Sequence, residues 1–360
     1  MTSLIREGDQ SQEVADIQAR LRSLGQKVDD ENGHFGPSTV AAVRAFQQRR
    51  SMLVDGIVGP ETWSELVEAS WRLGDRILYL TRPFMRGDDI ADLQKRLNAL
   101  GFDAGREDGI FGPLAYDAVR AFQKEYGIRE DGMFGQRTYA ALLGLRVERP
   151  GTAAHLREEL RHRHGHSLHG RTVMVDPGHG AGDAGSTSPT GTNESEICWH
   201  LARSVAERLS AAGAKVRFSR NEPECPDASE RARRANDLDT DLFVSLHLNS
   251  NEEPTAEGAC TYHFGTSRAG ADLAESIQSY LARLGARDCR VHARSHPLLR
   301  ETKMPAVLVE PAFITNPDEA KRLDDPDHLN TVAQAIVDGI ANFYQPLSDD
   351  HTQSGDTRVV

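Results

Sequence analysis

The 360-residue sequence has no long apolar run and no recognisable secretory signal. No stretch approaches 18 consecutive apolar residues, which excludes a membrane-spanning helix of ordinary length. The first ten residues, MTSLIREGDQ, lack both the basic and the apolar segment of a signal peptide. We therefore expect the chain to stay in the cytoplasm.

Cysteines are few, and none of them forms a CxxC pair. This spacing argues against a disulfide framework and against a zinc site made of thiolates. The sequence predicts four reduced thiols: Cys198, Cys225, Cys260 and Cys289.

An excess of basic residues is also missing. Acidic residues outnumber basic ones by 54 to 42, which gives a net charge of -12. This charge disfavours nucleic acid and anionic lipid as general partners. The length instead allows one large domain and smaller ones, each with its own core.

The first 145 residues contain an internal repeat with an offset of 76 residues. In the first part of each copy, apolar positions follow the 3, 4 and 7 spacing of one helix face and end at a glycine. Each copy is therefore predicted to begin with a short amphipathic helix. The matched residues are Val14, Ile17, Gln18, Leu21, Leu24 and Gly25, which recur as Ile90, Leu93, Gln94, Leu97, Leu100 and Gly101.

The rest of each copy predicts two further helices with glycine turns. Asp-Gly suits a turn because glycine accepts positive φ and aspartate caps its own backbone. Thr62 and Thr138 stand just before the last helical run. The matched residues are Phe35-Gly36, Phe46-Gln47, Asp55-Gly56, Gly59 and Thr62, which recur as Phe111-Gly112, Phe122-Gln123, Asp131-Gly132, Gly135 and Thr138.

These two units resemble the three-helix peptidoglycan-binding module, and we assign them to residues 8–70 and 84–145. Most of the shared residues are predicted core and turn positions rather than ligand contacts. The second copy has Ala115 and Tyr139 where the first has Thr39 and Trp63, so the grooves of the two copies are expected to differ. Residues 146–170 are polar and predict a linker, and residues 347–360 predict a disordered tail.

After residue 170 the sequence changes to buried-looking strands that end in polar residues. RTVMVD predicts a strand, and a glycine-rich loop with His179 follows it. Such a loop can cradle phosphate, but its spacing is not that of G-x-G-x-x-G before a helix. Residues 241–250 and 306–316 predict further strands, which end in His247 and Glu310. Strand ends are where sites form in open α/β sheets.

Glu194 precedes an apolar-periodic run and is therefore predicted at the start of a helix. A carboxylate is favourable there for the helix alone, because the helix dipole is positive at its first turn. Taken singly, this residue is explained without a functional role.

The ordered set of motifs resembles the zinc-dependent N-acetylmuramoyl-L-alanine amidases. The resemblance covers about residues 171–345 and implies an α/β domain, here 171–346, with a central mostly parallel or mixed sheet flanked by helices. The matching segments are Asp176 to Gly180, Glu194 to Ala202, Arg231 to Asn236, Ser245 to Asn249 and Pro305 to Asn316.

Carried over by position, the family's zinc ligands are His179, Glu194 and His247, and its catalytic carboxylate is Glu310. Glu196 is the nearest rival ligand, but Glu194 keeps the family's spacing to the helix alanine. Pro311, after the catalytic glutamate, and Trp199, on the helix, depart from the usual pattern.

Three protein ligands of this kind leave one zinc position for water, as in catalytic zinc sites. The resemblance thus implies hydrolysis of the bond between the muramoyl lactyl group and L-alanine, with Glu310 as general base. Expected partners are peptidoglycan fragments or muramoyl-peptide precursors. We also predict that Arg300 pairs with a carboxylate of the stem peptide, and that Asn249 contacts substrate.

A second hypothesis follows from the expected location, because an unrestrained amidase in the cytoplasm would attack cell-wall precursors. The domain order also resembles CwlM-like actinobacterial proteins. That likeness implies a regulatory or scaffold protein of precursor synthesis, with a protein partner and little or no turnover. Because all four site positions are intact, catalysis is the favoured interpretation.

Overall fold

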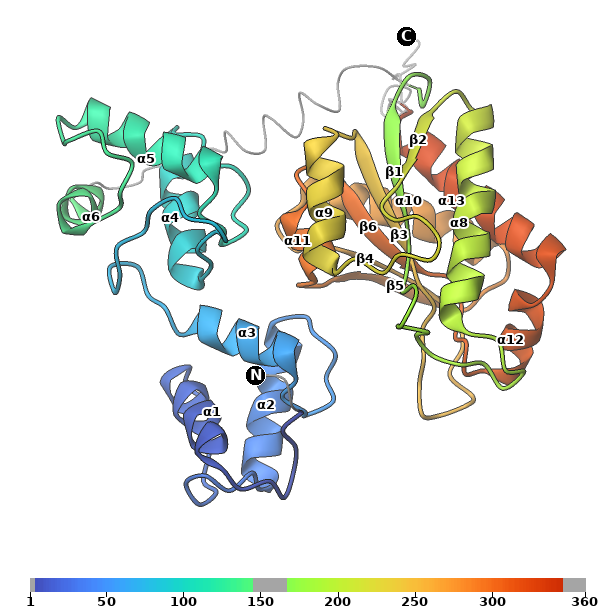
Figure 1. Ribbon diagram of the computed structural model, residues 1–360, viewed down its shortest axis with the longest axis horizontal. Helices are drawn as coiled ribbons and strands as arrows, with labels where there is room; N and C mark the ends of the chain where they lie inside the picture. Colours follow the sequence, from blue (N-terminus) through green and yellow to red (C-terminus); the bar gives the residue numbers. More distant parts are fainter. Residues whose placement is uncertain (1–3, 145–166, 346–360) are drawn as a thin grey trace, which may run out of the picture.

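The computed structural model describes residues 4–144 and 167–345, which form two helical modules and one α/β domain (Figure 1). The predicted tail lies outside the described residues, and so does most of the predicted linker. Within the described ranges, no helix is long and apolar enough to cross a bilayer. All four cysteines are free.

Each module has three helices, as the repeat predicts. Module 1 consists of α1 (Gln12–Ser23), α2 (Pro37–Arg49) and α3 (Pro60–Ala69). Module 2 consists of α4 (Asp88–Ala99), α5 (Pro113–Glu125) and α6 (Gln136–Leu143). The periodic residues pack into a separate core in each module.

A buried glutamine closes the same turn in both modules. In module 1, Gln47 donates from Nε2 to Asp55 Oδ1 at 2.7 Å, and its Oε1 accepts from the backbone of Gly56 at 2.9 Å. In module 2, Gln123 makes the same bonds to Asp131 and Gly132, at 2.9 and 2.8 Å. These repeated polar residues thus have a structural role, because a buried amide needs partners.

The α/β domain is built on a six-stranded mixed sheet with the strand order β2-β1-β3-β6-β4-β5. The strands are β1 (Thr172–Pro177), β2 (Lys215–Phe218), β3 (Leu242–Leu246), β4 (Ala259–His263), β5 (Asp288–Ala293) and β6 (Ala306–Glu310). The first four in that order are parallel, while β4 pairs antiparallel with β6 and parallel with β5. The predicted fold class is confirmed.

Helices cover both faces of this sheet. On one face, α8 (Glu194–Ala211), α10 (Arg268–Arg283) and α13 (Pro326–Phe343) pack on the strands in the largest hydrophobic core. On the other face, residues of α9 (Ala228–Asp237) and α11 (Pro297–Glu301) meet the sheet in a smaller core. The short helix α12 (Pro317–Leu323) follows β6.

The order of the strands positions the predicted site. The strands β1, β3 and β6 are adjacent and parallel, so their carboxyl ends lie at one edge of the sheet. His179 follows β1, His247 follows β3 and Glu310 ends β6. Residues separated by 131 positions in the chain, from 179 to 310, therefore meet at one edge.

Candidate metal centre

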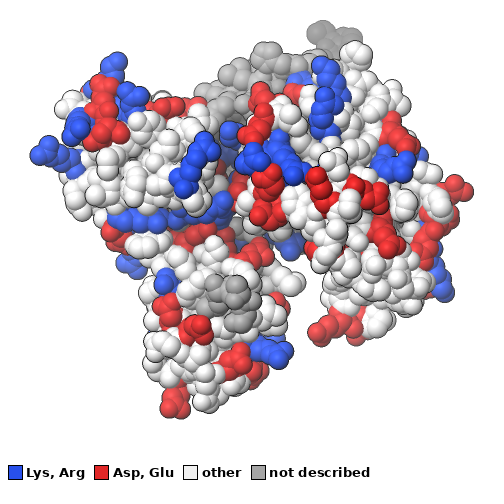
Figure 2. Space-filling view, viewed as in Figure 1, with Lys and Arg blue, Asp and Glu red and all other residues white. Residues whose placement is uncertain are grey.

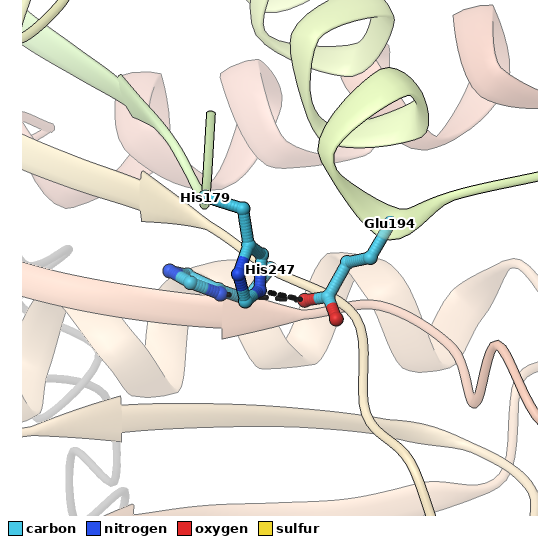
Figure 3. Close-up of side chains that lie close together, drawn as sticks. All are labelled: His179, Glu194 and His247. Atoms are coloured by element: carbon cyan, nitrogen blue, oxygen red, sulfur yellow. Dashed lines mark hydrogen bonds and ion pairs between the residues drawn. The ribbon is translucent and has the colours of Figure 1, made fainter. Parts of the chain in front are cut away.

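Two imidazoles and one carboxylate converge at this edge (Figure 3). His179 Nε2 lies 3.0 Å from Glu194 Oε1, and His247 Nδ1 lies 3.3 Å from the same oxygen. Their potential ligand atoms all lie within 4.8 Å of one another. The two rings are partly exposed, whereas the glutamate side chain is 3% exposed.

Glu194 is held by the backbone as well as by the histidines. It is the first residue of α8, where the helix dipole favours a negative charge. Its Oε1 accepts from the backbone N–H of Leu248 at 2.9 Å and its Oε2 from that of Ser186 at 3.1 Å. Although burial alone would raise it, the pKa of Glu194 is lowered by the hydrogen bonds and charges of the two histidines. The carboxylate is therefore ionised at neutral pH.

His179 is oriented from its far side. Its Nδ1 lies 2.9 Å from Asp183 Oδ2, which leaves Nε2 directed at Glu194. A carboxylate on the outer nitrogen is the usual arrangement for a metal-binding histidine, because it fixes the tautomer and the ring. Burial acts in the opposite sense, but Glu194 and Asp183 raise the pKa of His179.

Glycines in the loop after β1 make room for the rings. A Cβ at Gly178 would lie 2.6 Å from His247 Cε1. A Cβ at Gly185, whose φ is +66°, would lie 2.8 Å from both Glu194 Oε2 and His179 Nε2. The glycine-rich loop thus serves close packing around side chains, and the prediction of a histidine site explains it better than a phosphate cradle.

A buried ion pair also supports the loop after β1. Asp176, which is fully buried, lies 3.0 Å from Arg231 Nη1 and accepts from Ser245 Oγ at 2.6 Å. Arg231 also donates from Nη2 to the backbone oxygen of His179 at 2.6 Å. His179 has a positive φ of 58°, a conformation that non-glycine residues rarely adopt. The arginine thus supports the strained backbone of a predicted ligand.

Glu310 lies at the end of β6 with its side chain 10% exposed. Arg294, directly after β5, places Nη1 3.5 Å from Glu310 Oε1, and its guanidinium lies 5.0 Å from the centre of the Tyr262 ring. Burial raises the pKa of Glu310, while the charges of Arg294 and His247 oppose that rise. A carboxyl group with a raised pKa can both accept and return a proton near neutral pH.

Comparison with known proteins identifies the family of the chain. The sequence profile of the N-acetylmuramoyl-L-alanine amidases matches residues 173–342, and that of a peptidoglycan binding domain matches residues 10–66 and 86–142. The N-acetylmuramoyl-L-alanine amidase CwlM of Mycobacterium tuberculosis is 39% identical over 363 residues, which cover 94% of this chain and 89% of that protein. The chain belongs to the N-acetylmuramoyl-L-alanine amidase family.

Other amidases match about half of the chain. The amidase LytC of Bacillus subtilis is 38% identical over 179 residues, which cover 49% of this chain and 36% of that protein. The crystal structure of an amidase from Clostridium difficile 630 is 31% identical and covers 48% of this chain and 96% of that chain, with a TM-score of 0.47. CwlM and LytC are both named as amidases, which favours the catalytic interpretation over the regulatory hypothesis.

The structure brings together most of the site residues predicted from the sequence, but not all. Glu196, the rival ligand, is exposed, and its Oε1 accepts from Asn193 Nδ2 at 3.4 Å. Asn249 is half-buried, and its Oδ1 accepts from the backbone of Ser250 at 2.9 Å, so its contact with substrate stays a prediction. Arg300 does not lie with His179, Glu194 and His247. Its guanidinium is occupied by two glutamates of module 1.

Two charged residues at the site, Asp183 and Arg294, were not predicted from the sequence. Asp183 carried a signal, since it stands four residues after His179 in the same loop. Arg294 carried none. It reaches Glu310 only because β5 and β6 both flank β4, an arrangement that local patterns do not reveal.

Proposed function

We propose that this chain holds a zinc ion with His179, Glu194 and His247, and that it hydrolyses the amide bond between the lactyl group of muramic acid and L-alanine. The observation that carries the proposal is the convergence of the three side chains at the sheet edge where Glu310 ends its strand. Family membership supplies the substrate class.

The donor set fits zinc. Imidazole nitrogens and carboxylate oxygens are ordinary zinc ligands, and three of them from the protein are typical of catalytic sites. Metal ligands must also present lone pairs to the ion. The ionised carboxylate of Glu194 and the orientation of the His179 ring by Asp183 meet this requirement. When bound, zinc supplies Lewis acidity, which lowers the pKa of water towards 7 and polarises a carbonyl group.

The protein's own groups would move the protons. Glu310 takes a proton from the attacking water, whose oxygen forms the new bond to the lactyl carbonyl carbon. The carbon–nitrogen bond then breaks, and Glu310 returns the proton to the departing alanine nitrogen. Arg294 keeps Glu310 in place and favours its ionised form before the reaction.

The test pairs zinc content with turnover of a soluble muramoyl-peptide. Glu194→Gln is expected to lose both zinc and activity, whereas the matched control Glu196→Gln, two residues away and exposed, keeps both. Glu310→Gln is expected to keep zinc and lose activity by roughly 10²- to 10⁴-fold, the usual contribution of a general base. Zinc-loaded wild type without turnover contradicts the proposal.

The modules belong to the same proposal. Their match to a peptidoglycan binding domain supports peptidoglycan or muramoyl-peptides as the ligands of this chain. Binding of wall fragments to the full chain, measured with and without zinc, tests this part. A cytoplasmic location and a protein partner stay predictions, which cell fractionation and affinity purification would test.

A further inference from the structure

The modules touch the amidase domain through charged residues. Figure 2 shows basic and acidic side chains side by side where the helical modules meet the α/β domain. Arg300 of α11 places Nη1 2.8 Å from Glu65 Oε1 and 2.9 Å from Glu68 Oε2, both on α3 of module 1. None of the three side chains is more than 10% exposed.

Module 2 binds the same short segment from another side. Arg86, just before α4, places Nη2 2.7 Å from Glu301 Oε1. Arg106 donates to the backbone oxygen of Thr302, and to that of Leu299 at 3.5 Å. Four consecutive residues, 299–302, therefore each contact a module.

The two modules are also tied to each other at this place. Arg50 of module 1 lies 2.7 Å from Asp88 at the start of α4 and 3.5 Å from Glu65. The modules and the amidase domain together line a cleft of about 300 Å³, to which Arg50, Asp88, Arg294 and Arg300 contribute. The cleft thus extends to the arginine that contacts Glu310.

The docking residues are not shared features of the repeat. With the offset of 76 residues, Glu65 and Glu68 correspond to Ala141 and Gly144, and Arg86 corresponds to Gln10. Each module thus meets the amidase domain with residues that its sister copy lacks.

The strongest contrast is at Arg106, which occupies the position of Asp30 in module 1. Asp30 accepts from the backbone and hydroxyl of Thr39, at 2.6 and 2.7 Å, and so caps α2. Despite some desolvation, the bonds from Thr39 and Ser38 lower the pKa of Asp30 to about 2. In module 2 the capping pair is replaced by Ala115 and an arginine that faces the other domain.

We propose that residues 299–302 form a docking surface for the module pair of the same chain, with Arg300 as its anchor. The modules then work from one fixed position beside the cleft that Arg294 lines, instead of as freely tethered anchors. A peptidoglycan fragment bound to the modules is thereby held at a set distance from the metal site. Docking itself does not require that the site turns over substrate.

The test is small-angle X-ray scattering of the full chain, with folding checked by circular dichroism. Arg300→Glu places a third acid beside Glu65 and Glu68, so the modules are expected to separate and the radius of gyration to rise. The double variant Glu65→Gln with Glu68→Gln removes the anchor's partners from the other domain and is expected to do the same. It keeps the test valid if Arg300→Glu does not fold.

The matched control is Glu13→Gln with Glu31→Gln, which makes the same change at exposed positions of module 1. It is expected to scatter like wild type. A curve from either folded docking variant that overlays wild type overturns the proposal. So does a wild-type radius of gyration already equal to that of Arg300→Glu. Because scattering reports no catalysis, these results are separate from the test of amidase activity.

Discussion

Replacing Arg294 with glutamine should move the acidic limb of the pH–rate profile to higher pH. A general base works only when ionised, so the rate falls as the pH drops through the pKa of Glu310. Burial raises that pKa and the Arg294 charge opposes the rise. Loss of the guanidinium, 3.5 Å from Glu310 Oε1, must therefore raise the pKa further.

The size of the effect follows from the geometry. An opposite charge at this range lowers a carboxyl pKa by roughly 1 to 3 pH units. The low end is expected, because Arg294 is 24% exposed and 3.5 Å is longer than a close ion pair. A change of about 1 pH unit corresponds to about 1.4 kcal/mol.

The assay is kcat/KM against pH for zinc-loaded protein on a soluble muramoyl-peptide. Arg290→Gln is the matched control, since it removes an exposed arginine from β5, the strand that Arg294 follows, and should leave the profile unchanged. An acidic limb in Arg294→Gln that stays in place, or moves to lower pH, refutes the assigned role of Arg294.

Three further changes test the support of the site and the fold. Asp183→Ala should weaken zinc binding by roughly 10- to 100-fold in a chelator competition, because the outer nitrogen of the ligand histidine loses its partner; unchanged affinity counts against that orientation. Asp176→Asn leaves the Arg231 charge buried without a counter-charge and should cost about 3–5 kcal/mol in urea unfolding, whereas a loss under 1 kcal/mol contradicts a buried pair. Gly339→Ala puts a Cβ 2.6 Å from Ile277 Cα, so α13 and α10 must move apart at a cost of about 1–3 kcal/mol; an unchanged melting temperature argues against this close packing.

The sequence predicted those features that local patterns encode. The repeat of apolar positions and Asp-Gly turns predicted both three-helix modules, because helix periodicity and turn chemistry are short-range properties. The residues of the candidate metal centre were predicted from the family resemblance. Two of them, His179 and His247, follow strands that parallel pairing brings to one edge.

The remaining features depend on surfaces that meet only in the folded chain. Arg300 was predicted to bind a substrate carboxylate, and it does bind carboxylates, but those of Glu65 and Glu68, over 230 positions away. Charge complementarity alone could not tell a stem peptide from the chain's own module. Arg294 was missed for a similar reason, since its neighbour Glu310 depends on the order of β4, β5 and β6.

The most direct test of the central claim is to follow the oxygen atom. The zinc-loaded chain is incubated with a defined muramoyl-peptide in ¹⁸O-labelled water, and the masses of the products are measured by mass spectrometry. Cleavage at the proposed bond gives one labelled oxygen in the lactyl carboxylate and an unlabelled peptide that begins with alanine. Intact substrate in the presence of the zinc-loaded protein, or label in the peptide fragment, contradicts the account.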